Sequence, residues 1–305
     1  MSLKQFFNLQ SIKMKIIDTT TFFEENMMMD IRFNILNPYI DKFIVCESLF
    51  THSGKKKNIN FNINNYPKFK NKIVHLILEN QPVGLIEKEI LTTQEKRYNS
   101  ILRIRDQRNY IMSFLKEFSP DDYIIYSDND EIPDLKKFDL KSSKKKFTIF
   151  NQQMFYYKLN LNLPNLNWYG SKACKLKYLN SIDFLRNIKN KEYSFLRIDT
   201  LFSENKQNSV NIVKNGGWHF SNLKSYEDLE KKYLNDENHA EYEAQNISSI
   251  NIQDYIKRQV VPYNHNAKKD STSRFNETKL IKVDKDILPD YIKENFDKFK
   301  DWIAN

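Results

Sequence analysis

The chain has 305 residues and a mass of 36.7 kDa, and 40% of its residues are hydrophobic, so it can bury a sizeable core and is not a disordered protein. No apolar run approaches the ~20 residues of a membrane span, and the start, residues 1–13, lacks the apolar core of a signal peptide. These features predict a soluble, cytoplasmic protein. Two cysteines, Cys46 and Cys174, exclude a disulfide framework.

The net charge of +9 comes with four lysine clusters, at residues 55–57, 144–146, 231–232 and 268–269. A solvated surface is the ordinary reason for such clusters. The alternative is attraction of an anionic partner: a nucleotide, a phosphorylated glycan or the inner face of a membrane, which the protein would contact peripherally. Arginine and aromatic residues do not interleave along one basic stripe, so nucleic acid is not an expected partner.

Short apolar runs alternate with helical patterns in the first 130 residues. Strands are predicted at residues 14–18, 42–47, 72–78 and 123–127, which are mostly apolar on both faces. Helices are predicted at residues 24–37 and 106–118, the second with Asp106 as its N-cap. This β-α-β order predicts an α/β fold with a mostly parallel central sheet.

The second half of the chain has a different pattern, with an aromatic-rich strand, a loop and several helices. Residues 147–157 predict an aromatic-rich strand, and residues 160–175 read as a loop whose aromatic rings could wall a sugar site. The adjacent glycines Gly216 and Gly217 indicate a tight backbone site, where another part of the protein approaches the main chain closely. Further helices are predicted at residues 225–234, 251–259 and 289–302, the first with a capping pair formed by Ser225 and Asp228.

The segment Asp128-Asn129-Asp130-Glu131 directly follows the strand predicted at residues 123–127. In open α/β sheets, ligands bind at the carboxyl ends of the strands. Strand alternation would point Asp128 and Asp130 to one side and Glu131 to the other. Two aligned carboxylates with room for phosphate oxygens suit Mg²⁺ or Mn²⁺. An acidic turn at the end of a strand is the structural alternative.

Several sequence blocks occur in a set order between residues 14 and 243. They are Phe22-Phe23-Glu24-Glu25, Asp30-Ile31-Arg32, Asp41 to Ser48, Gln107-Arg108-Asn109, Asp121 to Pro133, Trp168-Tyr169-Gly170, Leu185-Arg186 and Gly217 to Ser221. Their order and spacing resemble glycosyltransferase family 17, the family of the bisecting β-1,4-N-acetylglucosaminyltransferase.

The resemblance implies a GT-A type, Rossmann-like domain over residues 14–245, with residues 246–305 as a helical extension packed on it. It also implies an inverting transfer of a sugar, N-acetylglucosamine first, from a UDP-sugar donor to a glycan or glycolipid acceptor. Asp130 would bind the Mn²⁺ or Mg²⁺ ion directly, and Asp128 would bind it through water or reach the ribose. His219 would complete the metal shell, with a packed core histidine as the alternative.

Donor contacts are predicted for Asp18 and Glu47, at the ends of the first two strands. Arg108, near a helix start, is predicted to meet the diphosphate, with a surface ion pair as the alternative. Inversion also requires a general base on the acceptor side. The candidates are Asp183, Asp199, Glu241 and Glu131, and for Glu131 a structural role beside the Ile132-Pro133 turn is equally consistent with the sequence.

Two positions depart from the family pattern. Met27 stands where an acid is common, which weakens a catalytic role for its helix, and Lys56 stands where proline is common, which suggests a different acceptor loop. Animal members have a membrane anchor that this chain lacks, so a bacterial or viral surface glycan is the expected acceptor. A metal-dependent phosphodiesterase or nucleotidyltransferase and a non-catalytic glycan-binding module stay open as alternatives.

Overall fold

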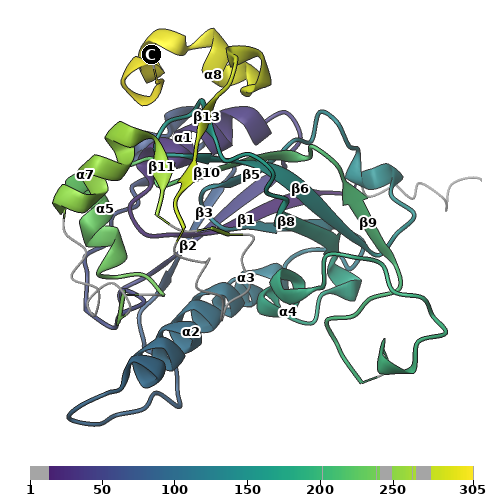
Figure 1. The fold of residues 1–305 in the computed structure, drawn as a ribbon. Coiled ribbons are helices and arrows are strands. Elements are labelled where there is room, and N and C mark those ends of the chain that lie inside the picture. The colour runs from purple at the N-terminus through teal and green to yellow at the C-terminus, as the bar shows by residue number, and fades with distance from the viewer. Residues whose placement is uncertain are drawn as a thin grey trace, which may run out of the picture.

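The computed structural model describes residues 14–200, 202–237, 239–240, 249–262, 264–265 and 276–304. A large mixed sheet lies between two groups of helices (Figure 1). The helix α1 (Asn26–Leu36) covers one face, and α2 (Thr93–Tyr110), α3 (Met112–Leu115) and α4 (Ile182–Asn187) cover the other. None of the described helices is long and apolar enough to cross a membrane. Both cysteines are free and buried.

Four parallel strands form the first half of the sheet, in the order β3-β2-β1-β4. Their bounds are Ile16–Phe22 for β1, Lys42–Ser48 for β2, Ile73–Leu78 for β3 and Tyr123–Ser127 for β4. The predicted parallel core is confirmed. However, β1 continues past Asp18 as far as Phe22, because the threonines that follow are β-branched and pack inside the sheet although they are polar.

The second half of the sheet adds antiparallel strands, whose order the sequence did not predict. The strand β8 (Trp168–Lys175) runs antiparallel to β4 and to the long β6 (Phe147–Tyr156). The other strands around β6 are β5 (Glu131–Pro133), β7 (Leu161–Asn162), β9 (Val210–Val213), β10 (Gly217–Ser221) and β13 (Ile281–Lys282). The prediction of a loop over residues 160–175 is therefore wrong: the polar residues Ser171 and Lys172 of β8 are buried, which hid the strand pattern.

The helix α2 begins well before the predicted start, so Asp106 lies inside it and not at its N-cap. The true N-cap is Thr92, whose side chain accepts a hydrogen bond from Glu95 N while the Glu95 carboxylate accepts one from Thr92 N. Most of α2 is polar, and hydrophobic periodicity therefore indicated only its last part.

The remaining elements lie mainly in the last third of the chain. The helix α5 (Tyr226–Tyr233) has Ser225 as its N-cap, as predicted, and α7 (Ser249–Arg258) agrees with its prediction. One helix was predicted over residues 289–302, but α8 (Asp290–Glu294) is followed there by a 3-10 helix. The 3-10 helices are Ile63–Asn65, Pro67–Phe69, Leu140–Ser142, Leu176–Tyr178, Ile198–Thr200, Lys285–Ile287 and Phe296–Trp302, and the strands β11 (Val260–Val261) and β12 (Thr278–Lys279) pair with each other.

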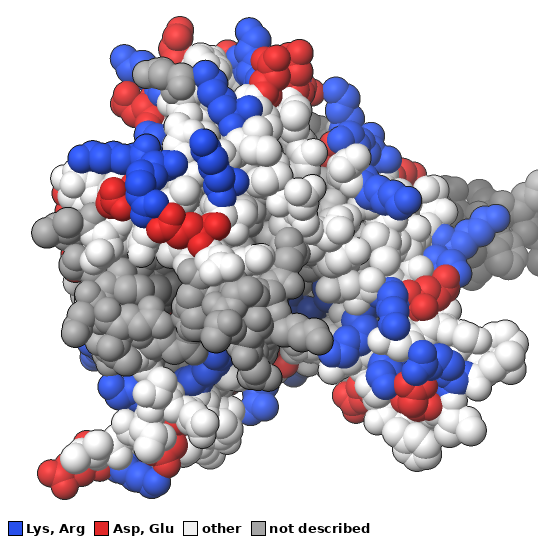
Figure 2. All heavy atoms as spheres, in the orientation of Figure 1, with Lys and Arg blue, Asp and Glu red and all other residues white. Residues whose placement is uncertain are grey.

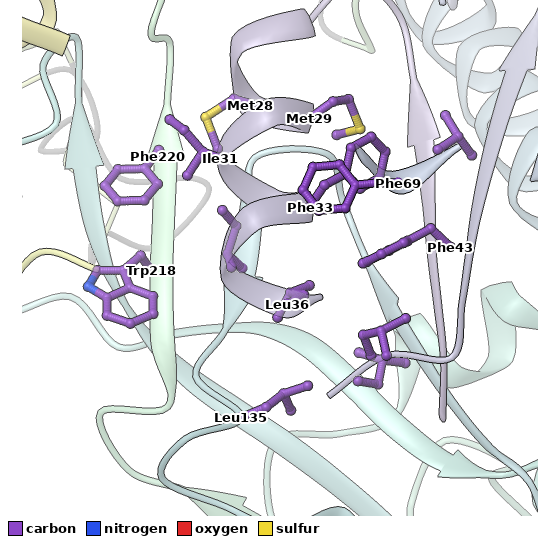
Figure 3. Close-up of a cluster of buried hydrophobic side chains, with 14 of the residues drawn as sticks. Met28, Met29, Ile31, Phe33, Leu36, Phe43, Phe69, Leu135, Trp218 and Phe220 are labelled. Atoms are coloured by element: carbon purple, nitrogen blue, oxygen red, sulfur yellow. The ribbon is translucent and has the colours of Figure 1, made fainter. Parts of the chain in front are cut away.

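The core on one face of the sheet is organised by α1 (Figure 3). Phe33 packs edge-on against Phe43 of β2, with ring centroids 4.9 Å apart. On the opposite side of the same helix, Met28 and Ile31 face Phe220 of β10. This one helix therefore joins the parallel half of the sheet to the strand that carries His219.

A buried ion pair fastens α1 to the sheet. Arg32 is fully buried and donates to both carboxylate oxygens of Asp18, at 2.6 and 2.7 Å, and to the carbonyl oxygen of Glu131 at 2.6 Å. Asp18 lies in the middle of β1 and not at its end, so this structure places it in the core. A buried acid paired in this way serves the fold, because either charge alone would be strongly destabilising.

Close packing of β10 against β5 depends on Gly217. Its φ of +137° is a conformation that L side chains rarely adopt, and a Cβ atom there would lie 2.1 Å from the carbonyl oxygen of Ile132. The tight backbone site predicted at Gly216 and Gly217 is confirmed. The described residues of the C-terminal region also contact this strand, since Trp218 Nε1 donates to the carbonyl oxygen of Ile287 at 2.8 Å.

Candidate active site

A cavity of about 330 Å³ lies at the carboxyl end of β4. Its lining includes the segment Asp128–Glu131, His219 and Ser221 of β10, Arg108 of α2, and Lys232 of α5. A larger hollow of about 1030 Å³ lies between α1 and the C-terminal region, but none of the predicted site residues lines it. The smaller cavity is therefore the candidate active site.

The acidic motif is a turn and not a continuation of the strand. β4 ends at Ser127, and Glu131 N donates to the carbonyl oxygen of Asp128 at 3.1 Å. The Glu131 carboxylate in turn accepts a hydrogen bond from Asp128 N, also at 3.1 Å. Strand alternation therefore does not orient Asp128 and Asp130, and that step of the prediction is wrong. Both residues line the cavity, but their carboxylates have different partners.

Asp128 is held by arginines. Its Oδ1 accepts hydrogen bonds from the Tyr126 hydroxyl at 2.9 Å and from Arg108 Nη2 at 3.2 Å, and its Oδ2 accepts one from Arg186 Nη2 at 2.7 Å. Burial alone would raise the pKa of Asp128, but the two guanidinium groups and the hydroxyl outweigh it and hold that pKa well below its usual range. Asp128 is therefore an anion whose charge the protein itself balances.

Arg108 lies in the last turn of α2 and not near a helix start. Its Nε donates to the Tyr126 hydroxyl at 3.0 Å, and its Nη1 lies 3.5 Å from Asp183. Burial opposes the charged form, but Tyr126, Asp128 and Asp183 together raise the pKa of Arg108. It lines the cavity as one member of a partly buried network.

Glu131 is fully buried and holds several groups at once. One carboxylate oxygen accepts from Trp168 Nε1 at 2.7 Å and from Arg186 Nη2 at 2.9 Å. Arg186, on α4, also donates to the carbonyl oxygen of Gly170 at 2.8 Å. These contacts favour the structural role for Glu131, because an acid so fully engaged is not available to accept a proton from an acceptor sugar.

Asp130 lies beside His219, with Oδ2 and Nε2 3.3 Å apart. The His219 ring is buried against Trp168, with ring centroids 4.6 Å apart, and its Nδ1 has no hydrogen-bond partner among the described residues. Burial would raise the pKa of Asp130, but His219 and Lys232 outweigh it and lower that pKa. The imidazole nitrogen that faces the acid of the motif is therefore Nε2.

The pair formed by Asp130 and His219 fits a divalent cation. Carboxylate oxygen and imidazole nitrogen are both accepted by Mn²⁺, and Mg²⁺ accepts the first. Within the described ranges, no three His, Cys, Asp or Glu side chains converge on one point, so water and phosphate oxygens would fill the other coordination positions. Both oxygens of Asp128 already accept hydrogen bonds, which fits a contact with the ion through water.

Glu47 does not line the cavity. It is buried near the end of β2, where its carboxylate accepts hydrogen bonds from Asn60 N and Phe61 N at 2.7 and 3.0 Å and pairs with Lys57. Burial opposes ionisation, but these partners and His75 lower the pKa of Glu47. Its contacts hold the loop that follows β2.

The predicted general bases are not brought together. Asp183 pairs with Arg108 on the outer side of the network, and Asp199 lies in an exposed ion pair with Arg197 and Lys206. Neither lines the cavity. Glu241 lies outside the described residues.

Other residues that line the cavity were not proposed from the sequence. Among them are the acids Glu25, Asp236 and Glu237. Glu25 was visible only within a family-like block, and the other two follow α5 without any motif. Arg186 was likewise visible only as part of the Leu185-Arg186 block, since no local pattern tells which acids an arginine will reach.

Residues 3–302 match the sequence model of glycosyltransferase family 17. The match covers nearly the whole chain, including the acidic turn and His219. This chain belongs to glycosyltransferase family 17.

Two relatives carry the name beta-1,4-mannosyl-glycoprotein 4-beta-N-acetylglucosaminyltransferase, one from Rattus norvegicus and one from Homo sapiens. Each is 27% identical to this family 17 chain over 128 residues, which is 41% of the chain. The matched part is only 22% of the rat protein and 23% of the human one, so the chain spans less than a quarter of either relative.

Among solved structures, HddC from Yersinia pseudotuberculosis aligns with a TM-score of 0.31 at 12% identity, over 67% of this chain and 92% of HddC. The inositol-1-phosphate CTP transferase from T. maritima gives a TM-score of 0.30 at 10% identity, over 67% of this chain and 86% of that protein. TM-scores of this size do not establish a common fold.

The arginine network predicts a pH-dependent loss of stability. Arg186→Met leaves the carboxylates of Asp128 and Glu131 without their shared cation, so the free energy of unfolding at neutral pH should fall by about 3–5 kcal/mol. Because the pKa of Asp128 is lowered in the folded protein, this stabilisation is present above the ordinary aspartate pKa and is lost as pH falls toward the folded value. The difference from wild type should therefore narrow below about pH 4. Urea unfolding at neutral and acid pH measures it.

Arg197→Met is the matched control, because Arg197 pairs with Asp199 where both side chains are exposed. We expect it to change stability by less than about 0.5 kcal/mol. A deficit in Arg186→Met that stays constant with pH would contradict the assigned network.

Proposed function

We propose that this family 17 member is a GT-A type enzyme that transfers N-acetylglucosamine from a UDP-sugar to a glycan, with inversion and with the help of Mn²⁺ or Mg²⁺. The observation that carries the proposal is the convergence of the acidic turn with His219 in one cavity at the end of a parallel strand. The names of the rat and human relatives support the choice of sugar. The acceptor we propose is a bacterial or viral surface glycan or glycolipid.

The parallel half of the sheet supports a nucleotide-sugar donor at this cavity, because open α/β sheets bind such ligands at the carboxyl ends of their strands. Asp130 and His219 would hold the cation, which acts as a Lewis acid for the charge that builds on the leaving diphosphate. Lys232, on the cavity wall, adds a positive charge close enough to affect Asp130. Asp128, kept ionised by Arg108 and Arg186, is oriented to accept from water or from a ribose hydroxyl.

We propose that the nucleoside end of the donor lies where the cavity reaches the ends of β1 and β2. A recess of about 40 Å³ shares Thr21, His52 and Gln107 with the cavity and is also lined by Ser48, the last residue of β2. Burial and nearby Arg108 lower the pKa of His52 to about 4, so its imidazole is neutral at physiological pH. We therefore propose that Thr21 of β1 and Ser48 of β2 contact the donor, in place of Asp18 and Glu47 of the same strands.

We propose Asp236 as the general base. It lines the cavity and follows Lys232, whose charge reaches Asp130, by four residues in the sequence. Two further acids, Glu25 and Glu237, line the same cavity and are the alternatives to Asp236. Asp236 belongs to the segment after β10, which fits an acceptor that enters opposite the diphosphate.

A phosphodiesterase or nucleotidyltransferase that uses two cations fits this site less well. Two ions about 3.5–4 Å apart need several bridging acids. Here Asp128 is balanced by two arginines, and Asp130 is the acid of the turn that lies beside a histidine, His219. This distribution of charge supports one cation and therefore glycosyl transfer.

The cation assignment predicts a specific loss of nucleotide binding. Asp130→Asn and His219→Ala should each weaken Mn²⁺-dependent binding of UDP by more than the roughly 10–100-fold that loss of an outer-sphere partner costs. Calorimetry with and without Mn²⁺ measures this. Asp183→Asn, a carboxylate outside the cavity, is the matched control and should bind UDP like the wild type. If Asp130→Asn binds UDP with unchanged Mn²⁺-dependent affinity, Asp130 is not a metal ligand.

The proposed reaction predicts a single displacement. With Mn²⁺, the purified protein should turn over UDP-N-acetylglucosamine faster than other UDP-hexoses, and an α-linked donor should give a β-linked product, because no nucleophile is needed under the anomeric carbon. Proton NMR of the anomeric signal decides the stereochemistry. An α-linked product or a glycosyl adduct on the protein would refute the mechanism, and release of nucleoside monophosphate would favour the phosphodiesterase.

The base assignment predicts a defect in turnover and not in donor binding. Asp236→Asn should lower kcat by about 10²–10⁴-fold, the usual contribution of general base catalysis, while Mn²⁺-dependent UDP affinity stays unchanged. Asp199→Asn tests one of the general bases predicted from the sequence and should leave kcat at the wild-type value. If Asp236→Asn keeps full activity, the base is another residue of the cavity wall.

A further inference from the structure

Residues 188–209, here called the lobe, leave the body after α4 and return at β9 (Figure 1). The described part of the lobe carries four large apolar side chains that are almost fully in water. Phe195, Leu196, Ile198 and Phe202 are 78%, 77%, 72% and 86% exposed. Single exposed apolar residues are common on soluble proteins, but four within eight residues form a patch that indicates an interaction surface.

The lobe has a defined shape. Lys189 N donates to the carbonyl oxygen of Asn205 at 2.8 Å, and Tyr193 N donates to that of Gln207 at 2.9 Å, so the two arms of the lobe are bonded to each other. Tyr193 is buried at its base. The apolar side chains are therefore held outward by a bonded scaffold and do not fold back on the lobe.

Basic residues surround the patch. Lys191, Arg197 and Lys206 lie around the Tyr193 ring, at 4.8, 5.5 and 6.0 Å from its centroid. The lysine cluster at residues 144–146 adjoins the lobe, through Lys145 to Glu192 and through Lys146 N to the Ser209 hydroxyl. Residues 188–209 and 144–146 together contain seven lysines and arginines against three acids, a net charge of +4. In Figure 2 the charged side chains gather in the middle of the lobe, and its outer end is uncharged.

We propose that the lobe docks on an anionic lipid bilayer, with the four apolar side chains in the interfacial layer and the basic residues on the headgroups. Exposed apolar side chains surrounded by lysine and arginine are the combination that binds an anionic bilayer surface. A second copy of the chain is a poorer occupant, because the lobe together with residues 144–146 carries a net charge of +4, and two such surfaces would repel each other.

The lobe differs from the lysine clusters that the sequence first suggested as a membrane contact. Lys57 pairs with Glu47, Lys232 lines the cavity, and residues 268–269 lie outside the described residues. Among the described residues, the cluster at 144–146 is the one that bonds to the lobe.

The root of the lobe also borders the active site. Lys189 and Asn190 line a groove of about 490 Å³ that shares Trp168 and His265 with the cavity. A docked lobe would bring a lipid-linked glycan to this groove, a consequence that rests on the proposed function. The docking itself does not depend on catalysis and can be measured without substrate.

Vesicle co-sedimentation of the full chain tests the proposal. Vesicles of phosphatidylcholine with an equal amount of phosphatidylglycerol should bind the protein, and phosphatidylcholine alone should bind it less. Phe195→Ser combined with Phe202→Ser should weaken binding by about tenfold or more, because two buried aromatic side chains are lost from the contact. Added salt should weaken binding further by screening the lysines and arginines.

Val83→Ser combined with Ile90→Ser is the matched control, since these side chains are 97% and 83% exposed on a different loop. It should bind vesicles like the wild type, and neither pair should change Tm because all four side chains lie in water. Absence of binding to anionic vesicles, or an equal loss in both pairs, would overturn the proposal. So would self-association that Phe195→Ser with Phe202→Ser abolishes while no vesicle binding is seen, which would assign the lobe to a second copy.

Discussion

The carboxylate of Glu131 holds together segments that are far apart in the sequence: it binds Arg186 of α4 and Trp168 of β8, and the carbonyl group of the same residue accepts a hydrogen bond from Arg32 of α1. A carboxylate with no access to water is very costly unless it is paired and fully hydrogen-bonded. Arg186 satisfies it and, with the same guanidinium group, reaches Asp128. The orientation of the acidic turn therefore follows from the need to compensate one buried charge.

This arrangement gives the two aspartates of the turn different chemistry. Asp128 is balanced by two arginines and the Tyr126 hydroxyl, whereas Asp130 has His219 beside it and a positive charge from Lys232 nearby. The protein thus supplies the compensating charge at Asp128, and Asp130 is the acid to which we assign the proposed cation. Such a division keeps the turn rigid before any ligand binds, which lowers the ordering cost of binding.

The end of α4 links the site to the lobe. Lys172 is buried beneath it, and its ammonium group donates to the carbonyl oxygens of Arg186 and Ile188 at 2.8 and 2.5 Å. Burial, with Arg186 nearby, lowers the pKa of Lys172 to about 7. These bonds fix the helix end from which Arg186 reaches the acidic turn and from which the lobe departs. The root of the lobe is therefore anchored to the same residues that orient the site.

The sequence alone determined the parallel strands and the place of the acidic turn, because buried strands and the turns that end them have local patterns of apolar and polar residues. It also indicated the close approach at Gly217, where a side chain would collide with the neighbouring strand. Tertiary structure alone decided the pairing of charges. In a strand pattern, Asp18 and Glu47 look like residues that bind a ligand. In the structure Asp18 pairs with Arg32, and Glu47 accepts hydrogen bonds from the loop after β2. Which cation reaches which acid depends on contacts between residues as far apart in the sequence as Asp30 and Lys298, and no local pattern of residues indicates them.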